Sequence, residues 1–439
     1  MSIKEQYMRK KFWIKEFVQG SHMWNDFKEI EYIYNNPVGG EKIRQQRLSC
    51  FIDFAIRNVP FYKRVGSINL QDFPIIDKQL IKANPTDFLA SKESIPGQHG
   101  KFHIQSTSGS TGTPFSLPQD TRCRTRRIAT IKFGNELVGF HSFEPMCHMR
   151  ALAHYYGGDK EIFYRKDLNI TYIDNTNLNE DKINRIIAAF NDSGAKIIRG
   201  YCTPIDTITT YAIENGLEYI NHPTFILGGE VMLDSTLRKL HEKMYCNVVS
   251  QYANEENGVL GQSEINQSGT EITLNRSNCI IEILKFNSSE PVMPGELGRI
   301  VVTDFTNYAM PMIRYDIGDA AMLGEVKDGI LMGLSNLIGR KTDLIYCTNG
   351  RQIDMFNSCP YDIYNNPDVN QWQFIQMGKY LYEVNLCVRD ESLKSQRQHF
   401  IDEFKSLLGN DALVTVNFID EIPVLQSGKR RCVMCLSCD

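Results

Sequence analysis

The chain has 439 residues, of which 42% are hydrophobic and 23% are charged, and its formal net charge is −4. This composition is close to that of ordinary globular proteins and excludes disordered, collagen-like and coiled-coil chains. The balanced charge provides no attraction for nucleic acid or for an anionic membrane. No apolar run reaches the roughly 18 residues that span a bilayer, and the first residues lack the apolar core of a secretory signal. We therefore expect a cytoplasmic protein that binds no nucleic acid and is not inserted in a membrane.

The sequence pattern divides the chain into a long first part and a short second part. Residues 1–65 carry apolar residues at helical spacing and are predicted to be helical. From about residue 100 to residue 340, short apolar strands alternate with helices, which predicts parallel strands joined by right-handed crossovers in a layered α/β domain. The clearest of these strands are 195–201, 224–230 and 247–252. From about residue 342 the pattern is that of a separate, small α+β domain.

The sequence contains 12 cysteines, and most are scattered singly, as free buried thiols are in cytoplasmic enzymes. The exception is the end of the sequence, where Cys432, Cys435 and Cys438 are each separated by two residues. A structural zinc site needs four ligands, usually with a second pair elsewhere, and no second pair occurs. We therefore favour a cysteine-rich tail over a metal site, and the metal alternative stays open.

The most informative segment is 106–114, STSGSTGTP, in which every residue before the proline is Ser, Thr or Gly. Such a segment cannot pack a core, but its backbone amides and hydroxyls can converge on anionic oxygens. It is not a Walker loop, because no Gly-Lys-Ser/Thr follows, and the sequence contains no GxGxxG fingerprint. Taken alone, the segment could equally be a flexible linker.

Further motifs make the phosphate loop the better interpretation. The segment resembles the phosphate loop of the AMP-forming, adenylate-forming ligases, and the other motifs of that family follow in its order. They are Gly228-Gly229-Glu230, which resembles the adenine-flanking loop; YANEE (252–256), which resembles YGxTE; YDIGD (315–319), which resembles YxxGD; Gly339-Arg340 with Asp343, which resembles the interdomain hinge; and Ser427-Gly428-Lys429, which resembles the catalytic lysine motif. Ordered matches over residues 106–429 are far more specific than any one motif.

Three other segments indicate which family of the adenylate-forming ligases the chain resembles. FIDFAIRNVPFYKRV, FPIIDKQLIKANPTDFLA and AMPMIRYDIGD are similar to the phenylacetate–CoA ligase family. The compact length favours the relatives found with capsule or surface-polysaccharide biosynthesis genes. The resemblance implies a large layered α/β N-terminal domain of the adenylate-forming type, residues 1–341, and a small mobile α+β C-terminal domain, residues 342–439.

The resemblance also implies a nucleotide site for ATP. The residues that would cradle the β- and γ-phosphates are Ser106, Thr107, Ser108, Gly109, Ser110, Thr111, Gly112 and Thr113. Tyr252 would stack on adenine, where Gly228 and Gly229 allow a close backbone approach and Glu230 lies nearby. Without the family order, a half-buried tyrosine and a glycine turn would be the simpler interpretations.

The charged residues of the motifs would carry the chemistry. Asp319 would accept both ribose hydroxyls, and Arg340 would contact ribose or phosphate. Glu256 would bind Mg²⁺, which also contacts phosphate oxygens. Lys429 would neutralise the charge of the pentavalent transition state. The simpler alternatives are a turn aspartate, a solvated pair of acids and a solvated lysine in a basic tail.

Three positions depart from the family pattern. Ala253 and Glu255 replace a glycine and a threonine, which puts phosphate contacts from this loop in doubt, and Thr342 occupies the hinge position that is usually Asp or Lys. The basic segment 122–127, RCRTRR, is predicted to be a solvated helix face.

The acid pocket should lie between the phosphate loop and the segments 140–157 and 200–230. Candidate lining residues are His141, His148, His154, Tyr155, Tyr156 and Tyr201. Arg150 and the neighbouring histidines favour a polar or anionic acid over phenylacetate.

These inferences together predict an ATP-dependent, AMP-forming carboxylate ligase. It would form an acyl-adenylate, release pyrophosphate and pass the acyl group to an acceptor. Coenzyme A is the acceptor that the parent family implies, whereas the polysaccharide branch suggests an amine or hydroxyl. Two alternatives stay open, a nucleotidyltransferase that stops at adenylylation and a non-catalytic nucleotide-binding homologue. The oligomeric state, including a homodimer, is also open.

Overall fold

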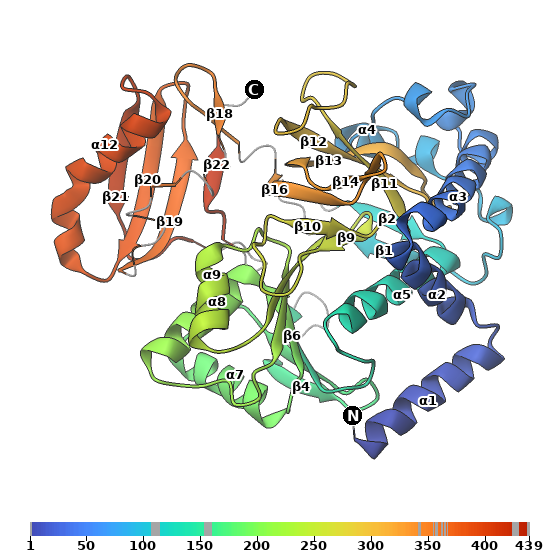
Figure 1. Cartoon of the computed structure of the whole chain (residues 1–439), viewed down its shortest axis with the longest axis horizontal. Coiled ribbons are helices and arrows are strands. Elements are labelled where there is room, and N and C mark those ends of the chain that lie inside the picture. The colour runs from blue at the N-terminus through green and yellow to red at the C-terminus, as the bar shows by residue number, and fades with distance from the viewer. Residues whose placement is uncertain are drawn as a thin grey trace.

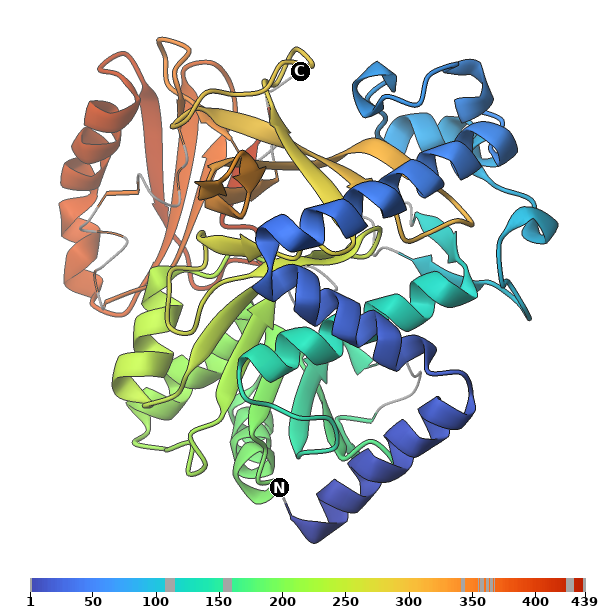
Figure 2. The same ribbon diagram turned by 45° about the vertical axis from the view of Figure 1, so that its right-hand side comes forward.

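The computed structural model describes the chain except for residue 1 and the segments 107–114, 153–159, 341–343, 354, 356–358, 361–362, 364–365, 367, 424–429 and 437–439. A large N-terminal part and a smaller C-terminal body lie beside each other (Figures 1 and 2). None of the helices in the described part of the chain combines the length and the apolar character needed to span a bilayer.

The N-terminal part begins with three helices. They are α1 (Ile3–Val18), α2 (His22–Asn35) and α3 (Pro37–Asn58). Ser2 and Glu5 form a reciprocal capping box at the start of α1, and α3 begins with Pro37, whose missing N–H is not needed in the first turn. Helix α2 contacts both α3 and α5 (Thr121–Leu137), so the N-terminal helices cover α5 (Figure 2).

A twelve-stranded sheet is the framework of the described N-terminal part. Its order is β11-β12-β13-β16-β10-β9-β8-β7-β6-β3-β5-β4. The strands are β3 (Met146–Arg150), β4 (Ile162–Arg165), β5 (Ile170–Asp174), β6 (Ile197–Tyr201), β7 (Thr224–Gly228), β8 (Val248–Asn254), β9 (Gly258–Gln262), β10 (Ile272–Leu274), β11 (Cys279–Leu284), β12 (Leu297–Asp304), β13 (Met312–Leu323) and β16 (Gly333–Arg340).

The strands β5, β3, β6, β7 and β8 are parallel neighbours. Helices α7 (Glu180–Asp192) and α8 (Cys202–Glu214) pack on one face, where Ile186, Ile205 and Phe225 are buried in one cluster. Helix α5 lies on the other face, because Asn135 near its end accepts a hydrogen bond from Arg199 of β6. The parallel strands therefore end at one common edge, which is where ligands bind in sheets of this kind.

Of the remaining strands, β4 pairs antiparallel with β5 at the far edge, and the others pair antiparallel and pack on the side of α3. Tyr62 is fully buried there, and its hydroxyl donates to the carbonyl of Pro311 at 3.1 Å and accepts from the amide of Ile313 at 3.1 Å. Shorter elements complete this part of the chain. They are η1 (Tyr62–Arg64), η2 (Leu70–Asp72), α4 (Lys78–Ala83), η3 (Pro85–Phe88), η4 (Lys92–Ser94), β1 (His103–Ser106), β2 (Ser116–Gln119), α9 (Asp234–Arg238), η5 (Lys239–Lys243), β14 (Val326–Lys327) and β15 (Ile330–Leu331).

The C-terminal body has its own sheet and core. Its strands pair in the order β21-β20-β19-β22, and α12 packs on them through Phe400 and Phe404, which are buried against Phe374 (Figure 1). Its elements are β17 (Ile345–Tyr346), β18 (Gln352–Ile353), β19 (Val369–Gln376), β20 (Leu381–Val388), η7 (Glu391–Gln396), α12 (Arg397–Leu408), β21 (Leu413–Phe418) and β22 (Val433–Cys435). The predicted fold class, a large layered α/β domain and a smaller α+β domain, is confirmed.

The prediction of a solvated basic face at 122–127 is wrong for two of its arginines. Arg126 is 3% exposed and Arg127 is 7% exposed. Arg126 pairs with Asp26 at 3.0 Å and with Glu29 at 3.0 Å, both on α2. The reason is tertiary: α2 covers this face of α5 and provides acids for it, which the periodicity of α5 alone cannot reveal.

Candidate active site

The carboxyl edge of the parallel strands brings the adenine-loop glycines beside β8. Gly228 ends β7, and a Cβ there would stand 2.8 Å from the carbonyl oxygen of Gln251, so any side chain would clash with backbone. Gly229 has a φ of +76°, a conformation that favours glycine. Both glycines therefore have a conformational reason to be in this turn, and they leave the space above the strand ends clear of side chains.

Tyr252, Asp319 and Arg340 form one connected group. The hydroxyl of Tyr252 on β8 donates to Oδ2 of Asp319 on β13 at 2.8 Å. Nε of Arg340 lies 3.6 Å from Oδ1 of Asp319, and its Nη1 donates to the carbonyl of Ile317 at 2.9 Å. Asp319 and Arg340 are register partners in the β13–β16 ladder, which fixes this pairing.

The electrostatics of this group follow from its burial and charge. The side chains of Tyr252 and Asp319 are buried, whereas Arg340 is half exposed. Burial and the carboxylate of Asp319 raise the pKa of Tyr252 well above its ordinary value, so the phenol remains a hydrogen-bond donor. Asp319 is the largest cause of the raised pKa of Arg340. In this group the carboxylate of Asp319 accepts a hydrogen bond from the phenol of Tyr252 and lies beside the half-exposed guanidinium of Arg340.

Glu256 lies near a lysine that the motifs did not indicate. Oε1 of Glu256 is 3.7 Å from Nζ of Lys78, at the start of α4, and this ammonium also stands 5.4 Å from the centre of the Phe115 ring. Burial lowers the pKa of Lys78, and Glu256 opposes that effect. The two residues are far apart in sequence, so spacing gave no signal. Lys78 belongs to the segment FPIIDKQLIKANPTDFLA, whose similarity to the phenylacetate–CoA ligase family assigns this lysine no role.

Arg127 of α5 binds the backbone of the loop that carries Glu255 and Glu256. Its Nη1 donates to the carbonyl of Glu255 at 3.0 Å, its Nη2 donates to the carbonyl of Glu256, and Nη2 lies 3.4 Å from Asp304. The burial of Arg127 thus has a use, because a guanidinium with fixed donors holds two successive carbonyls.

The hairpin β1–β2 brings the two ends of the predicted phosphate loop together. Ser106, its first residue, pairs in register with Ser116, and their hydroxyl oxygens are 2.7 Å apart. The adjacent Gln105 donates its side-chain amide to the carboxylate of Glu255. The hairpin is therefore fastened to the Glu255–Glu256 loop. The rest of the predicted phosphate loop, Thr107 to Thr113, lies outside the described residues.

Glu230 joins the two bodies. Its carboxylate accepts hydrogen bonds from the amide of Thr203 at 2.9 Å and from the Thr203 hydroxyl at 3.0 Å. The same carboxylate accepts the amide of Arg430, from the C-terminal body, at 3.1 Å. Arg389 and Glu214 form a second ion pair between the two bodies. Lys429 lies outside the described residues, but the residue that follows it is thus hydrogen-bonded at the active edge.

The other sequence-predicted residues are distributed unevenly. His148 and Tyr201 lie on the strands at the predicted acid pocket, whereas His141 precedes β3 and its Nδ1 lies 3.4 Å from Glu136, at the opposite edge of the sheet. His154, Tyr155, Tyr156, Thr342, Asp343 and Cys438 lie outside the described residues.

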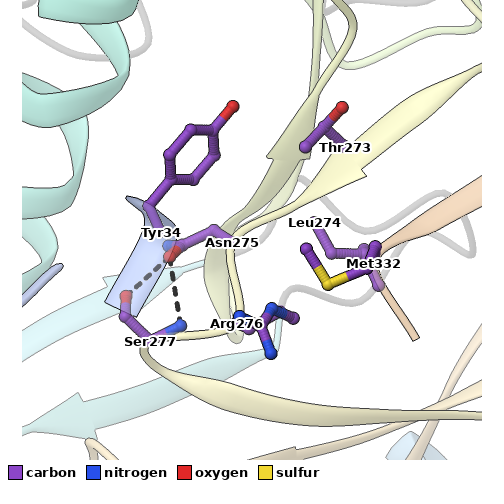
Figure 3. A pocket seen from close by; sticks show the side chains of 7 residues that line it. All are labelled: Tyr34, Thr273, Leu274, Asn275, Arg276, Ser277 and Met332. Atoms are coloured by element: carbon purple, nitrogen blue, oxygen red, sulfur yellow. Dashed lines mark hydrogen bonds between the residues drawn. The ribbon is translucent and has the colours of Figure 1, made fainter. Parts of the chain in front are cut away.

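A cavity of about 160 Å³ lies away from this edge (Figure 3). Its lining residues come from the end of α2, from β10 and from the segments around them: Tyr34, Thr273, Leu274, Asn275, Arg276, Ser277 and Met332. None of the predicted nucleotide residues lines it, so we assign it no part in the site.

The magnesium prediction can be tested against the donor set at Glu256. Within the described part of the chain, no group of three or more His, Cys, Asp and Glu side chains could hold a metal ion. Mg²⁺ is commonly bound by one or two carboxylates together with substrate phosphates and water, and the single carboxylate of Glu256 fits that mode.

Comparisons with known proteins agree with this geometry. Residues 346–435 match the family model of the CapK C-terminal domain. The chain is 24% identical over 420 residues to Protein CapK of Staphylococcus aureus, covering 89% of this chain and 88% of that protein. A crystal structure of 2-hydroxyisobutyryl-CoA ligase in the postadenylation state, in complex with R3-HIB-AMP, matches with a TM-score of 0.69 at 16% identity over 91% of this chain and 90% of that one. The chain has the adenylate-forming ligase fold. The predicted resemblance to the adenylate-forming ligases, and to their capsule-biosynthesis branch, is confirmed.

Two further structures add detail. The anthranilate CoA ligase AuaEII, in complex with anthranoyl-AMP, matches with a TM-score of 0.55 at 12% identity, over 74% of this chain and 64% of that one. The 2-hydroxyisobutyryl-CoA ligase in its thioesterification state scores only 0.54, also over 91% of this chain and 90% of that one. Both structures therefore support the same adenylate-forming fold for this chain.

Proposed function

We propose that the chain is an ATP-dependent, AMP-forming ligase that adenylates a carboxylic acid and passes the acyl group to an acceptor. The observation that carries this proposal is the group of Tyr252, Asp319 and Arg340 at the carboxyl edge of the sheet. An ionised aspartate at a rim accepts two hydrogen bonds from a ribose diol, and a neighbouring guanidinium suits a phosphate or ribose oxygen. The fold of the CoA ligases and the similarity to CapK support the same conclusion.

The first half-reaction would join the acid to AMP. A carboxylate oxygen attacks the α-phosphorus of ATP, the bond from phosphorus to the bridging oxygen breaks, and pyrophosphate leaves with the electron pair. The protein's contribution is positioning and charge stabilisation. Asp319 would orient the ribose, and the loop of Ser106 to Thr113 would hold the β- and γ-phosphates. Lys429 would neutralise the charge that builds on the α-phosphate.

Glu256 would hold Mg²⁺ on the phosphate side of the site. When bound, that ion supplies positive charge to the phosphate oxygens. Lys78 lies beside the same carboxylate and would face the same phosphates. Burial lowers the pKa of its ammonium, Glu256 opposes that effect, and the charges of Lys82 and Arg340 lower the pKa further. A polyanion at this position would therefore stabilise the charged lysine.

The second half-reaction requires a change of domain arrangement. We infer that residues 1–341 and 342–439 are the two moving units, with the hinge at Thr342. The contact between Glu230 and Arg430 would then break, and the segment 345–353 would approach the acceptor site. Coenzyme A, or an amine or hydroxyl of a surface-polysaccharide precursor, would take the acyl group from the adenylate.

The direct test is carboxylate-dependent ATP–pyrophosphate exchange with Mg²⁺, across aryl, fatty, amino, uronic and dicarboxylic acids. We expect exchange with one acid or one narrow class, because adenylation is reversible. Reactions without acid are the control. ATP binding with no exchange across the panel would contradict the proposal and favour adenylylation of another substrate or a non-catalytic role.

Replacing Lys78 with methionine is expected to raise the KM for ATP about tenfold, because a charged contact to phosphate is lost. The aliphatic replacement keeps the packing on Phe115, so the melting temperature should change little. Steady-state exchange at varied ATP measures the effect. Lys92→Met, an exposed lysine of η4, is the matched control. An unchanged KM in Lys78→Met would show that this lysine only balances the charge of Glu256.

A further inference from the structure

One face of the parallel sheet carries a cluster of basic side chains. Along β3, Cys147 and Met149 are buried, while His148 and Arg150 are partly exposed on the alternate side. His148 is the register partner of Arg199 on β6, so the two side chains share this face. The face lies under α5, because Asn135 of that helix contacts Arg199.

Arg199 has no acidic partner among the described residues. Its Nη1 donates to Oε1 of Gln251, and its Nη2 donates to Oδ1 of Asn135 at 2.7 Å, so both hydrogen bonds go to neutral amides. No ion pair within 4.0 Å involves it in the described part of the chain, and burial alone lowers its pKa to about 10. A desolvated guanidinium is costly unless an anion compensates it, and further N–H donors remain for such a ligand.

Gln251 provides an independent indication of a ligand. The residue is only 7% exposed, its Oε1 accepts from Arg199, and its Nε2 is buried with no hydrogen-bond partner in the structure. A Cβ built on Gly134 of α5 would stand 3.0 Å from Oε1 of Gln262 and 3.7 Å from this Nε2, so the donor faces α5 beside Gln262, at a position that has no side chain. A buried donor without an acceptor is rare and calls for a polar partner.

The other groups on this face reinforce the positive charge. Burial, Arg150 and Arg199 together lower the pKa of His148 to about 3, so its ring stays neutral next to two guanidinium groups. The acid in register with Arg150 is Asp174, which is already paired with Lys182 at 2.7 Å. Arg199 is thus the guanidinium of this face whose hydrogen bonds among the described residues go to neutral amides alone.

The depth of Arg199 indicates which part of a substrate it would meet. Tyr201 ends β6 and pairs in register with Gly228 of the adenine loop. Arg199 lies two residues further back, which is roughly 7 Å deeper at about 3.3 Å per residue. A group bound there is thus separated from the carboxylate that would react at the nucleotide edge.

We propose that the acid substrate carries a second anionic group, a carboxylate or a phosphate, at its far end, and that Arg199 binds this group together with Nε2 of Gln251. The substrate class would be diacids or phosphorylated acids. This inference rests on the proposed function.

The test is binding of matched acids to the full chain in the presence of AMP, measured by calorimetry. The probes are succinate, glutarate, adipate, isophthalate and 3-phosphonopropionate, each compared with the monoacid of the same length or ring, such as valerate or benzoate. We expect at least one dianion to bind on the order of 10- to 100-fold more tightly than its monoacid. Succinate against 3-phosphonopropionate, which have the same two-methylene spacer, distinguishes a carboxylate from a phosphonate.

Arg199→Met should remove this preference without altering AMP affinity. Arg185→Met, which removes an exposed arginine of α7 that pairs with Glu161, is the matched control. Equal binding of dianions and monoacids, a preference that survives Arg199→Met, or no binding of any dianion would overturn the inference. If Arg199→Met does not fold, the selectivity of the unmodified chain decides alone.

Pyrophosphate exchange with the same acids separates the two proposals. Binding of a dianion without exchange would support the inference of a second anionic group and contradict the proposed ligase activity. Exchange confined to monoacids would support the ligase activity and overturn the inference.

Discussion

Replacing Lys429 with alanine is expected to lower carboxylate-dependent pyrophosphate exchange on the order of 100- to 1,000-fold, with ATP affinity and melting temperature little changed. The amide of Arg430, the next residue, donates to Glu230 at 3.1 Å, and this backbone contact does not depend on the side chain of residue 429. A charge that stabilises mainly the transition state affects the rate more than binding.

The measurement is the exchange rate at saturating ATP, together with equilibrium binding of ATP. Lys394→Ala is the control, because it removes an exposed lysine from the same body, which among the described residues pairs with the exposed Glu391. An exchange rate equal to that of the unmodified chain would show that Lys429 does not stabilise the transition state. A loss of ATP binding in parallel would show instead that its role is in the ground state.

Replacing Asp319 with asparagine is expected to weaken AMP and ATP binding about 100-fold. The amide nitrogen of asparagine cannot accept, so one ribose hydroxyl loses its charged partner, a loss of about 1.5–3 kcal/mol, and the other keeps a weaker, neutral acceptor. The same change weakens the bond from Tyr252 and removes the ion pair with Arg340. We therefore also expect a loss of about 1–3 kcal/mol in the free energy of unfolding.

Calorimetry with AMP and denaturant unfolding separate these effects. Asp206→Asn is the matched control, because Asp206 pairs with Lys239 at 3.0 Å and accepts from Thr236 at 2.8 Å on the helical face of the sheet. The control should lose some stability and keep its AMP affinity. If Asp319→Asn lost only stability, the ribose role of this aspartate would be wrong, and the proposal would lose the observation that carries it.

The two bodies are joined where the proposed chemistry begins. The carboxylate of Glu230 serves both the start of α8 and the C-terminal body, so this acid of the adenine loop has a role in domain arrangement that its motif did not indicate. Any rotation of the C-terminal body relative to the large part would have to break the Glu230–Arg430 contact.

The sequence by itself determined the fold class and the order of the motifs. Strand and helix alternation between residues 100 and 340 depends on local periodicity, which a sequence displays directly. The glycines of 228–229 could be predicted for a similar reason, because a close backbone approach and a positive φ are properties of the residue itself. Asp319 and Arg340 could be named from their motifs, but not their register pairing.

Only the tertiary structure decided which side chains meet. Lys78 lies 3.7 Å from Glu256 across a large separation in sequence, and Arg126 and Arg127 are buried because α2 covers α5. Arg199 was not singled out, since a lone arginine in an apolar strand has no motif. Two observations make Arg199 a candidate ligand-binding residue. No acid pairs with it among the described residues, and Nε2 of the neighbouring Gln251 has no hydrogen-bond partner. Charge pairing and desolvation depend on which residues are neighbours in space, and the spacing of residues along the chain does not reveal those neighbours.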